Sequence, residues 1–362
     1  MRIAYTTKLG QQIIGDSLEV LKTFEDDSID LVVTSPPFAL LREKEYGNAD
    51  QAHYVAWLSE FGRAVLPKLK PTGSLVMDIG GAYKRGVPVR SLYPFRVLLK
   101  FCDELGYHLA EDFYWFNSSK LPSPIEWVNK RKIRVKDSVN NVWWFSKTEF
   151  PKADVSKVLT PYSDRMKKLL DNPEKYFAAK ERPSGHAMTH NFRDNGGAIP
   201  PNLLQIPNSE SNSNYLANCK RCQLKAHPAR FPAKLPEFFV QMLTEPGDLV
   251  VDIFGGSNTT GFVAERLGRR WASIELSEEY AAMSFLRFLP KSLPTKDLVR
   301  VYYHLLQDGP ISLLDFLTTR SVDGERVRAY LQTRISETRE QRATKRRARE
   351  LARLEFAEGV LG

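Results

Sequence analysis

The chain has 362 residues, of which 42% are hydrophobic, and it carries a formal net charge of +9. That length can bury a sizeable core, and the lack of a bilayer-spanning apolar run or a secretory N-terminus predicts a cytoplasmic protein with no membrane contact. The basic excess suits a polyanionic partner, since neutralising phosphates releases counterions.

The chain begins with patterns typical of strands around one short helix. Residues 1–10 are predicted to form a strand or an arm, and residues 11–38 run from strand to helix to strand. The apolar run at 29–33 is predicted to be a buried strand. A Gly-Asp-Ser-Leu segment at 15–18 precedes that strand.

A rigid corner follows the run 29–33. Pro36 and Pro37 remove two backbone donors and fix two φ angles, so the strand must end there. Pro36 also pushes Ser35 toward an extended conformation. Such a corner can stack a planar ring against Phe38 while its oxygen atoms accept hydrogen bonds from an exocyclic amine. An ordinary turn is the alternative interpretation.

Helical and strand patterns continue beyond the corner. The stretch 39–53 is polar without strong periodicity and is predicted to be a mobile loop. Helices are predicted at 53–69 and 92–105, and strands at 74–79, 113–117 and 140–147. Trp115 and Asn117 stand at a strand end, where they either line a pocket or belong to a packed aromatic strand.

The middle of the chain, residues 151–222, is rich in Pro, Asn, Ser, Lys and Arg and has few long apolar runs. Such side chains can read base edges and hold phosphates, and a solvated insertion is the alternative. Cys219 and Cys222 form one Cys-x-x-Cys with His227 close by. A structural zinc ion usually needs four ligands, so no metal site is predicted.

A later segment has the pattern of a nucleoside-binding βαβ unit. A short buried strand ends at Asp252, the adjacent Gly255 and Gly256 let backbone approach a ligand closely, and a helix begins near Thr259. The next strand ends at Glu275, 23 positions after Asp252, where a ribose-binding carboxylate is expected. The three spaced glycines of a dinucleotide fingerprint are absent. This pattern favours a nucleoside cofactor without phosphate, such as S-adenosylmethionine.

We call the segment with Pro36 and Pro37 the proline corner and the segment with Gly255 and Gly256 the glycine bend. Together they resemble the DNA amino-methyltransferases of restriction–modification type, over most of residues 10–285. In that family a Ser-, Asp- or Asn-Pro-Pro-aromatic box is catalytic, and an Asp-x-Phe-x-Gly-Ser-Gly box binds S-adenosylmethionine. The catalytic box comes first, as in the permuted β class, and its serine form with Phe38 resembles the cytosine-N4 branch. The segments 15–18 and 227–236 match further family boxes. Asn258 departs from the pattern, standing where glycine is commonest.

The resemblance implies an α/β fold, that of the Rossmann-like S-adenosylmethionine-dependent methyltransferases. It has a largely parallel central sheet in permuted order, a target-recognition insertion and a helical C-terminal extension. The expected parts are a catalytic half at 1–150, a target-recognition region at 151–222, a cofactor-binding half at 223–290 and a basic helical extension at 291–362. The extension could be a solvated charged helix, a phosphate clamp or a subunit contact.

The implied reaction moves a methyl group from S-adenosylmethionine to the N4 amine of a cytosine flipped out of double-stranded DNA. The residues expected to be catalytic are Ser35, Pro36, Pro37 and Phe38. Those expected to bind the cofactor are Asp252, Phe254, Gly255, Gly256, Ser257, Thr259, Glu275, Asp16 and Phe231. Two of these have plainer alternatives, because Asp16 could cap a helix and Glu275 could be a surface acid.

The catalytic box is expected to act through two acceptors. The Ser35 hydroxyl and the Pro36 carbonyl can accept from the two N–H bonds of the amine, which favours a pyramidal nitrogen with an available lone pair. Adenine-N6 methylation on the same scaffold stays open, as does a catalytically silent DNA-binding subunit. The expected partners are double-stranded DNA and a cognate restriction endonuclease, and the protein is expected to be a monomer or a homodimer.

Overall fold

The computed structural model describes residues 1–38, 53–173, 193–210, 213–307, 309–320, 322–340 and 345–361. Its strands are β1 (Arg2–Thr6), β2 (Gly10–Ile14), β3 (Ile29–Thr34), β4 (Leu69–Gly80), β5 (His108–Phe116), β6 (Val139–Ser146), β7 (Leu203–Gln205), β8 (Leu249–Asp252), β9 (Arg270–Glu275) and β10 (Ile311–Ser312). They form one ten-stranded sheet in the order β10-β1-β2-β9-β8-β3-β4-β6-β5-β7. The predicted loop at 39–53 lies, except for His53, outside the described residues.

Most neighbouring strands in this sheet are parallel. Only β1 with β2, and β6 with both β4 and β5, pair in antiparallel fashion within the described sheet. The α/β fold with a largely parallel sheet in permuted order, predicted from the sequence, is therefore confirmed. Strands β3 and β8 are far apart in the sequence but pair directly, with Leu31 opposite Val250 and Val32 opposite Val251.

Strand direction decides where the functional segments meet. Strands β2, β9, β8, β3, β4 and β5 all point the same way, as their parallel pairings and the shared antiparallel neighbour β6 require. Their carboxyl ends therefore lie along one side of the sheet, which we call the carboxyl edge. In open α/β sheets, ligands bind outside this edge.

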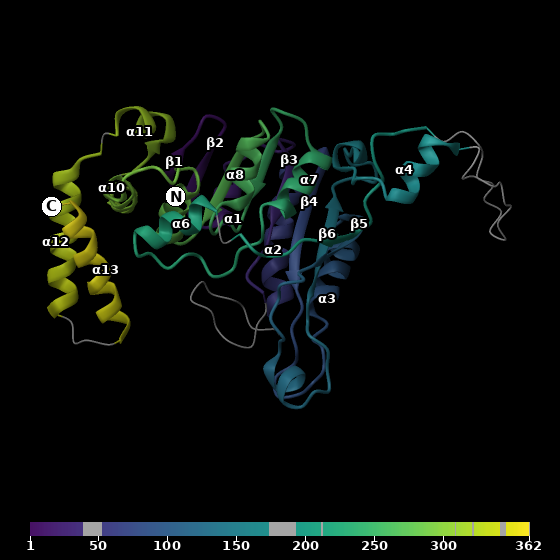
Figure 1. Ribbon diagram of the computed structural model, residues 1–362, viewed down its shortest axis with the longest axis horizontal. Coiled ribbons are helices and arrows are strands. Elements are labelled where there is room, and N and C mark those ends of the chain that lie inside the picture. The colour runs from purple at the N-terminus through teal and green to yellow at the C-terminus, as the bar shows by residue number, and fades with distance from the viewer. Residues whose placement is uncertain are drawn as a thin grey trace.

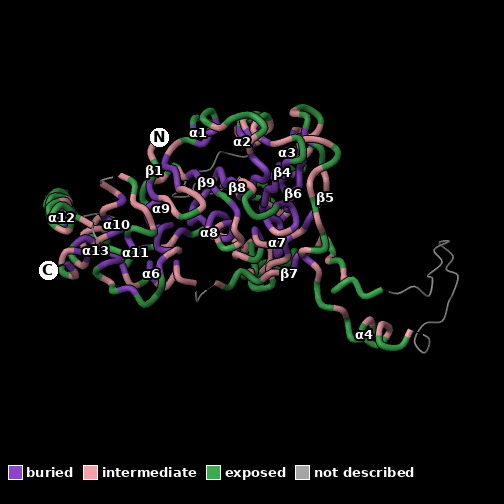
Figure 2. Tube along the Cα trace, turned by 90° about the horizontal axis from the view of Figure 1, so that it is seen from above, coloured by how far each residue is buried: buried purple, intermediate pink, exposed green. Residues whose placement is uncertain are grey.

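Helices cover both faces of the sheet (Figures 1 and 2). Side chains of β3 alternate between two cores, with Leu31 and Val33 on one face and Val32 on the other. The Val32 face is covered by α1 (Ser17–Leu21), α2 (Tyr54–Val65) and α3 (Tyr93–Leu99). The opposite face is covered by α6 (Asn214–Arg221), α7 (Lys234–Leu243), α8 (Thr259–Arg266), α9 (Glu278–Ser284) and α10 (Thr295–Gln307). Burial on both faces explains the near-continuous apolar sequence of the central strands.

The paired cysteines belong to this packing. Cys219 in α6 and Cys222 directly after it are buried free thiols, and desolvation raises the pKa of each to about 12. Within the described ranges, no group of three His, Cys, Asp or Glu side chains could hold a metal ion. In the same part of the chain, every helix is too short or too polar to cross a bilayer.

The first described part of the predicted target-recognition region, residues 151–173, starts on the opposite side of the sheet from the carboxyl edge, whereas β7 later in the region pairs with β5. A 3-10 turn (Val155–Val158) precedes α4 (Asp164–Asp171), which extends beyond the sheet in Figure 1. The Lys152 ammonium lies 2.6 Å from the Asp248 carboxylate, and Lys157 pairs with Glu245. Both acids directly precede β8, so this segment is anchored on the side of the sheet where the parallel strands begin, which we call the amino edge. Residues 174–192 and 211–212 are not described, and the recognition role stays a prediction.

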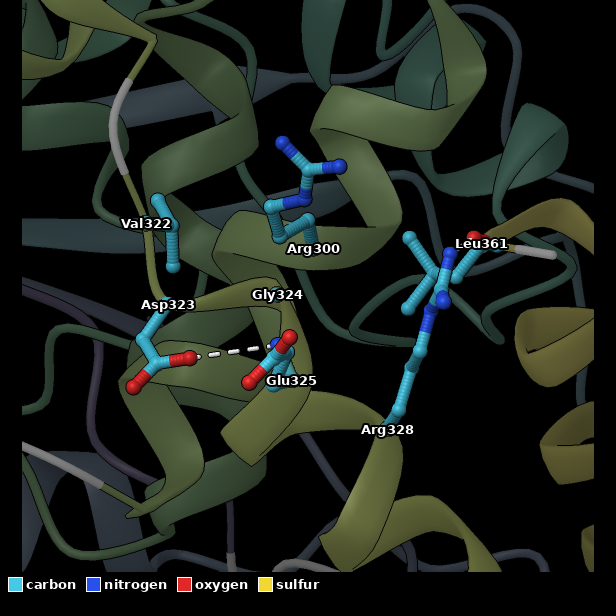
Figure 3. A pocket seen from close by; sticks show the side chains of 7 residues that line it. All are labelled: Arg300, Val322, Asp323, Gly324, Glu325, Arg328 and Leu361. Atoms are coloured by element: carbon cyan, nitrogen blue, oxygen red, sulfur yellow. Dashed lines mark hydrogen bonds between the residues drawn. The ribbon is translucent and has the colours of Figure 1, made fainter.

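The C-terminal extension is helical, as the sequence predicts. It contains α11 (Leu313–Thr319), α12 (Gly324–Glu340) and α13 (Lys345–Leu361), and the last two form a hairpin at one end of the molecule (Figure 1). Arg334 bonds to both Glu337 and Glu350 at 3.0 Å. A hollow of about 270 Å³ lies at the base of this hairpin. Figure 3 shows Arg328 of α12 beside Leu361, whose carbonyl accepts a hydrogen bond from the Arg328 guanidinium. Some of the predicted basic groups therefore serve to hold this hairpin together.

Candidate active site

A cavity of about 590 Å³ opens at the carboxyl edge and is lined from both halves of the chain. The predicted site residues that line it are Ser35, Pro36, Pro37, Phe38, Asp16, Phe231, Phe254, Gly255, Gly256, Ser257, Thr259 and Glu275. The proline corner and the glycine bend share one cavity because β3 and β8, whose ends carry them, are neighbours in the sheet.

Asp252 is the predicted site residue that does not line this cavity. Its carboxylate is 2% exposed and accepts hydrogen bonds from the Thr34 hydroxyl (2.7 Å), the Thr260 hydroxyl (2.8 Å) and the Phe254 amide (3.0 Å). Burial raises the pKa of this carboxyl, and these three donors oppose that rise. Thr34 directly precedes Ser35, so Asp252 ties the end of β3 to the glycine bend. The structure gives Asp252 this supporting position, and its direct contact with the cofactor stays a prediction.

Glu275 is not a surface acid. It ends β9, lines the cavity, and accepts hydrogen bonds from the Gly256 amide (2.7 Å) and the Ser277 amide (2.8 Å). Burial raises the pKa of its carboxyl. Each carboxylate oxygen has a further lone pair, so a neutral hydroxyl of a ligand can bond there without leaving a donor or acceptor unpaired.

The glycine bend owes its shape to the absence of side chains. A Cβ at Gly255 would collide with the Ser273 hydroxyl and lie 3.1 Å from the Ile274 carbonyl oxygen. Gly256 has a φ of +52°, and the His227 ring lies only 3.3 Å from where its Cβ would stand. Asn258, the departure from the family pattern, adopts a φ of +52° and caps α8 by accepting from the Gly261 amide at 3.0 Å. Asparagine tolerates this left-handed conformation, so the departure keeps the local turn.

We expect Gly255→Ala to lower cofactor affinity by at least tenfold, because the new methyl group must push the bend away from β9. The matched control is Gly359→Ala in α13, where a Cβ would meet nothing within 4 Å and alanine favours the helix. Calorimetric titration with S-adenosylmethionine measures both variants. Equal affinities for the two variants would contradict the expectation.

Asp16 both caps a helix and lines the cavity, so the two interpretations of this residue are compatible. Its Oδ1 accepts from the Leu18 amide at 2.8 Å at the start of α1. The neighbouring Ser17 hydroxyl donates to the Ile253 carbonyl at 2.6 Å, which ties this helix to the glycine bend. Trp57, Phe61 and Phe254 add an aromatic wall, with the Phe61 and Phe254 ring centroids 4.8 Å apart.

Asp78 is a site residue that the sequence analysis did not identify. It is 4% exposed near the end of β4, accepts from the Ser35 hydroxyl at 3.1 Å and from the Asn140 amide at 3.0 Å, and lines the cavity. Desolvation raises the pKa of its carboxyl from an ordinary value of 3.8 to about 6. The available signal was an acid within the otherwise apolar strand pattern 74–79, two residues before Gly80.

Phe38 is positioned by bare backbone. A Cβ at Gly80 would overlap the Phe38 ring, so the ring lies directly on the end of β4. Trp115 of β5 and Asn117, which directly follows β5, line the cavity, and the Trp115 indole donates to the Ile206 carbonyl at 2.7 Å. Trp115 is also 5% exposed and part of the core. Both interpretations of this aromatic strand therefore hold for it.

Comparison with known proteins agrees with this geometry. The family model described as DNA methylase matches residues 29–285. Type II methyltransferase M.PvuII of Proteus hauseri is 64% identical over 311 residues, which are 86% of this chain and 93% of that protein. Type II methyltransferase M.SmaI of Serratia marcescens is 28% identical over 302 residues, 76% of this chain and 90% of that protein. The solved structure of PvuII DNA methyltransferase (cytosine-N4-specific) has a TM-score of 0.72 at 57% identity and covers 86% of this chain and 98% of that one.

Proposed function

Because the chain belongs to the DNA methylase family, we propose that it transfers a methyl group from S-adenosylmethionine to the N4 amine of a cytosine in double-stranded DNA. The observation that carries the proposal is the shared cavity, in which the proline corner and the glycine bend face one ligand space. The 64% identity to M.PvuII and the serine form of the catalytic box favour cytosine over adenine.

The residues on the β8 and β9 side fit S-adenosylmethionine. The cavity volume lies within the usual range for small-ligand pockets. Glu275 offers free lone pairs to ribose hydroxyls, Asp16 can accept from an adenine amine, and Phe231 with Phe254 offers apolar surface to the ring. When bound, this cofactor supplies an electrophilic methyl carbon and a neutral thioether leaving group.

The residues on the β3 and β4 side hold the base and orient its amine. The Ser35 hydroxyl donates its hydrogen to Asp78, so its lone pairs remain available to accept from one N–H of the cytosine amine. The Pro36 carbonyl accepts from the other N–H, and Phe38 stacks on the ring. The two prolines fix these acceptors before the substrate arrives, which lowers the ordering cost at reaction.

Asp78 also gives the surplus amine proton a destination. After the nitrogen has gained the methyl carbon it carries one proton too many. That proton can pass from N4 to Ser35 Oγ while the Ser35 hydroxyl proton passes to Asp78 Oδ2, which lies 3.1 Å from that oxygen. A carboxyl whose pKa is about 6 is ionised and ready to accept at neutral pH.

Methylation of duplexes that differ in a single base tests the proposal. We expect tritiated methyl groups to appear as N4-methylcytosine after nucleoside digestion, and replacing the target cytosine by 5-methyl-2-pyrimidinone, which lacks the amine, to abolish incorporation. N6-methyladenine in the digest would instead favour the adenine alternative. Binding of both ligands without any methylated nucleoside would favour a silent DNA-binding subunit.

A restriction endonuclease of the same sequence specificity is the proposed partner. The relatives of this chain are Type II methyltransferases by name. Methylation of a DNA site protects that site only against an enzyme that cuts there. Digestion of host DNA before and after loss of this gene, with extracts of the same host, tests this pairing. Sedimentation of the purified chain distinguishes a monomer from a homodimer.

A further inference from the structure

The connections that follow β4 and β5 leave the carboxyl edge together and form a projection beside the cavity. Residues 81–92 follow β4 and residues 117–138 follow β5, and we call this pair of segments the basic arm. In Figure 1 it is the blue extension below the sheet, with a short helix at Glu126–Lys130 near its tip. We propose that the basic arm grips the sugar-phosphate backbone of duplex DNA beside the cavity. This inference rests on the proposed function, which makes DNA the substrate of the adjacent site.

The arm holds much of the protein's positive charge. Its first segment contributes Lys84, Arg85 and Arg90. Its second segment contributes Lys120, Lys130, Arg131, Lys132, Arg134 and Lys136. Against these nine basic residues stand only Glu126 and Asp137, so the arm carries +7 in a chain of net charge +9. A compact cationic projection of this kind neutralises phosphates and releases their counterions.

The arm is organised by its own contacts. Arg90 and Asp137 form an ion pair across the two segments at 2.6 Å, and the Arg134 guanidinium donates to the Pro88 carbonyl at 2.8 Å. The Arg131 guanidinium lies 5.0 Å from the Trp127 ring centroid. The remaining cations thus stand on a braced framework, and less ordering entropy is lost when a rigid backbone of phosphates is bound.

Position links the arm to the reaction. Asn117 and Lys120, at the base of its second segment, line the cavity itself. A duplex held along the arm therefore has its stacked bases next to the pocket that takes a flipped one. The two other basic regions are placed less well. The described start of region 151–222 is anchored at the amino edge, and no described residue of the C-terminal hairpin lines the cavity.

The arm also exposes apolar side chains, including Leu121 at 79% and Val135 at 86%. A protein interface would use such side chains, whereas DNA binding uses the surrounding charge. The charge density favours DNA, because nine like charges at a protein interface would repel unless the partner were strongly acidic.

The test compares two triple variants of the full chain that lose the same charge. The arm variant is Lys84→Ala, Arg85→Ala, Lys130→Ala, all exposed cations. The control variant is Arg165→Ala, Lys167→Ala, Lys168→Ala in exposed α4. Fluorescence anisotropy with a labelled mixed-sequence duplex of about 30 base pairs, across salt concentrations, gives the affinity and its salt slope. Unchanged melting temperature and S-adenosylmethionine affinity show that each variant is folded.

We expect the arm variant to lose at least about tenfold in duplex affinity, with a salt slope shallower by about three, and the control to stay near wild type. Wild-type affinity in the arm variant, or an equal loss in the control, would overturn the assignment. A change in self-association with intact DNA binding would overturn it in favour of a protein interface.

A second measurement needs no variant. Duplex DNA should protect Lys84 and Lys130 of the wild-type chain from acetylation of their amines, while Lys167 stays reactive. Absence of that protection overturns the arm assignment. Both measurements read binding alone, so a chain that binds through the arm yet transfers no methyl group would sink the proposed function and leave the arm assignment standing.

Discussion

Ser35→Ala is expected to lower the rate of methyl transfer by roughly 10²–10³-fold, the usual cost of removing one acceptor or donor aimed at a developing charge. The variant keeps the proline corner and Phe38 but leaves one N–H of the cytosine amine without its acceptor. Because Ser35 lies on the β3 side of the cavity, opposite the glycine bend, the affinity for S-adenosylmethionine should change by less than about twofold. Single-turnover methylation and calorimetric titration measure the two quantities separately.

Ser28→Ala is the matched control, since it removes a half-buried serine hydroxyl that donates to the Glu25 carbonyl just before the same strand. It should transfer methyl groups at the wild-type rate. A Ser35→Ala variant within a factor of a few of wild type would show that the hydroxyl does not act on the amine. A parallel loss of cofactor affinity would show that the residue shapes the whole cavity instead.

The local chemistry of the chain was enough to predict the two ligand-facing segments. Two prolines after a buried strand, and two glycines after another, restrict the backbone in ways that depend on few neighbours. Ser35, Gly255 and Glu275 accordingly line the cavity where the sequence placed them. The shared cavity itself followed from the family resemblance, because nothing local states that β3 and β8 are adjacent.

The supporting acids could not be assigned in this way. Asp252 ends its strand as predicted, but its partners Thr34 and Thr260 come from a neighbouring strand and the following helix, and only their positions show that its carboxylate joins β3 to α8. Asp78 lies in a strand whose apolar pattern predicts a plain core strand. Its role appears only when β4 pairs with β3 and places the carboxylate beside Ser35. Tertiary pairing therefore decided what these acids do.

The same limit applies to the surface that meets DNA. Residues 151–222 stand out in the sequence by composition, whereas the basic arm is divided between two connections separated by α3 and β5. Each connection alone reads as an ordinary loop. Their joint charge becomes visible only when parallel strands β4 and β5 bring both to the carboxyl edge.

Asp78→Asn is expected to slow methyl transfer by about 10²-fold or more without weakening cofactor binding. The Asn140 amide donates to one oxygen of residue 78, so an asparagine keeps its carbonyl toward Asn140 and turns its amide toward Ser35. The hydrogen bond to Ser35 then reverses, and the serine oxygen accepts where it formerly donated. One lone pair of the Ser35 oxygen is then no longer available to accept from the cytosine amine. The carboxylate that takes the surplus proton is also gone.

The dependence on pH separates this role from a structural one. The pKa of Asp78 is raised to about 6 in the folded protein, so the wild-type rate should fall as the pH drops below about 6 and the carboxylate is protonated. The Asp78→Asn variant has no such group, and its slow rate should lack that acidic limb. Rates from about pH 5 to pH 8.5 in single-turnover conditions measure both profiles. An acidic limb that persists unchanged in the variant would assign it to another group.

Stability should move in the opposite direction to activity. A carboxyl whose pKa is raised from 3.8 to about 6 on folding binds its proton more tightly in the folded state. Its contribution is therefore fully favourable below pH 3.8 and is lost as the pH rises through about 6. At pH 7 the buried charge opposes folding by about 3 kcal/mol. Asp78→Asn removes that charge, so its melting temperature at pH 7 should equal or exceed that of wild type, with the advantage shrinking below pH 6. A variant that loses both rate and melting temperature at pH 7 would show instead that Asp78 mainly holds the end of β4 in place. If the buried charge of Asp78 opposes folding, its removal should not lower the melting temperature.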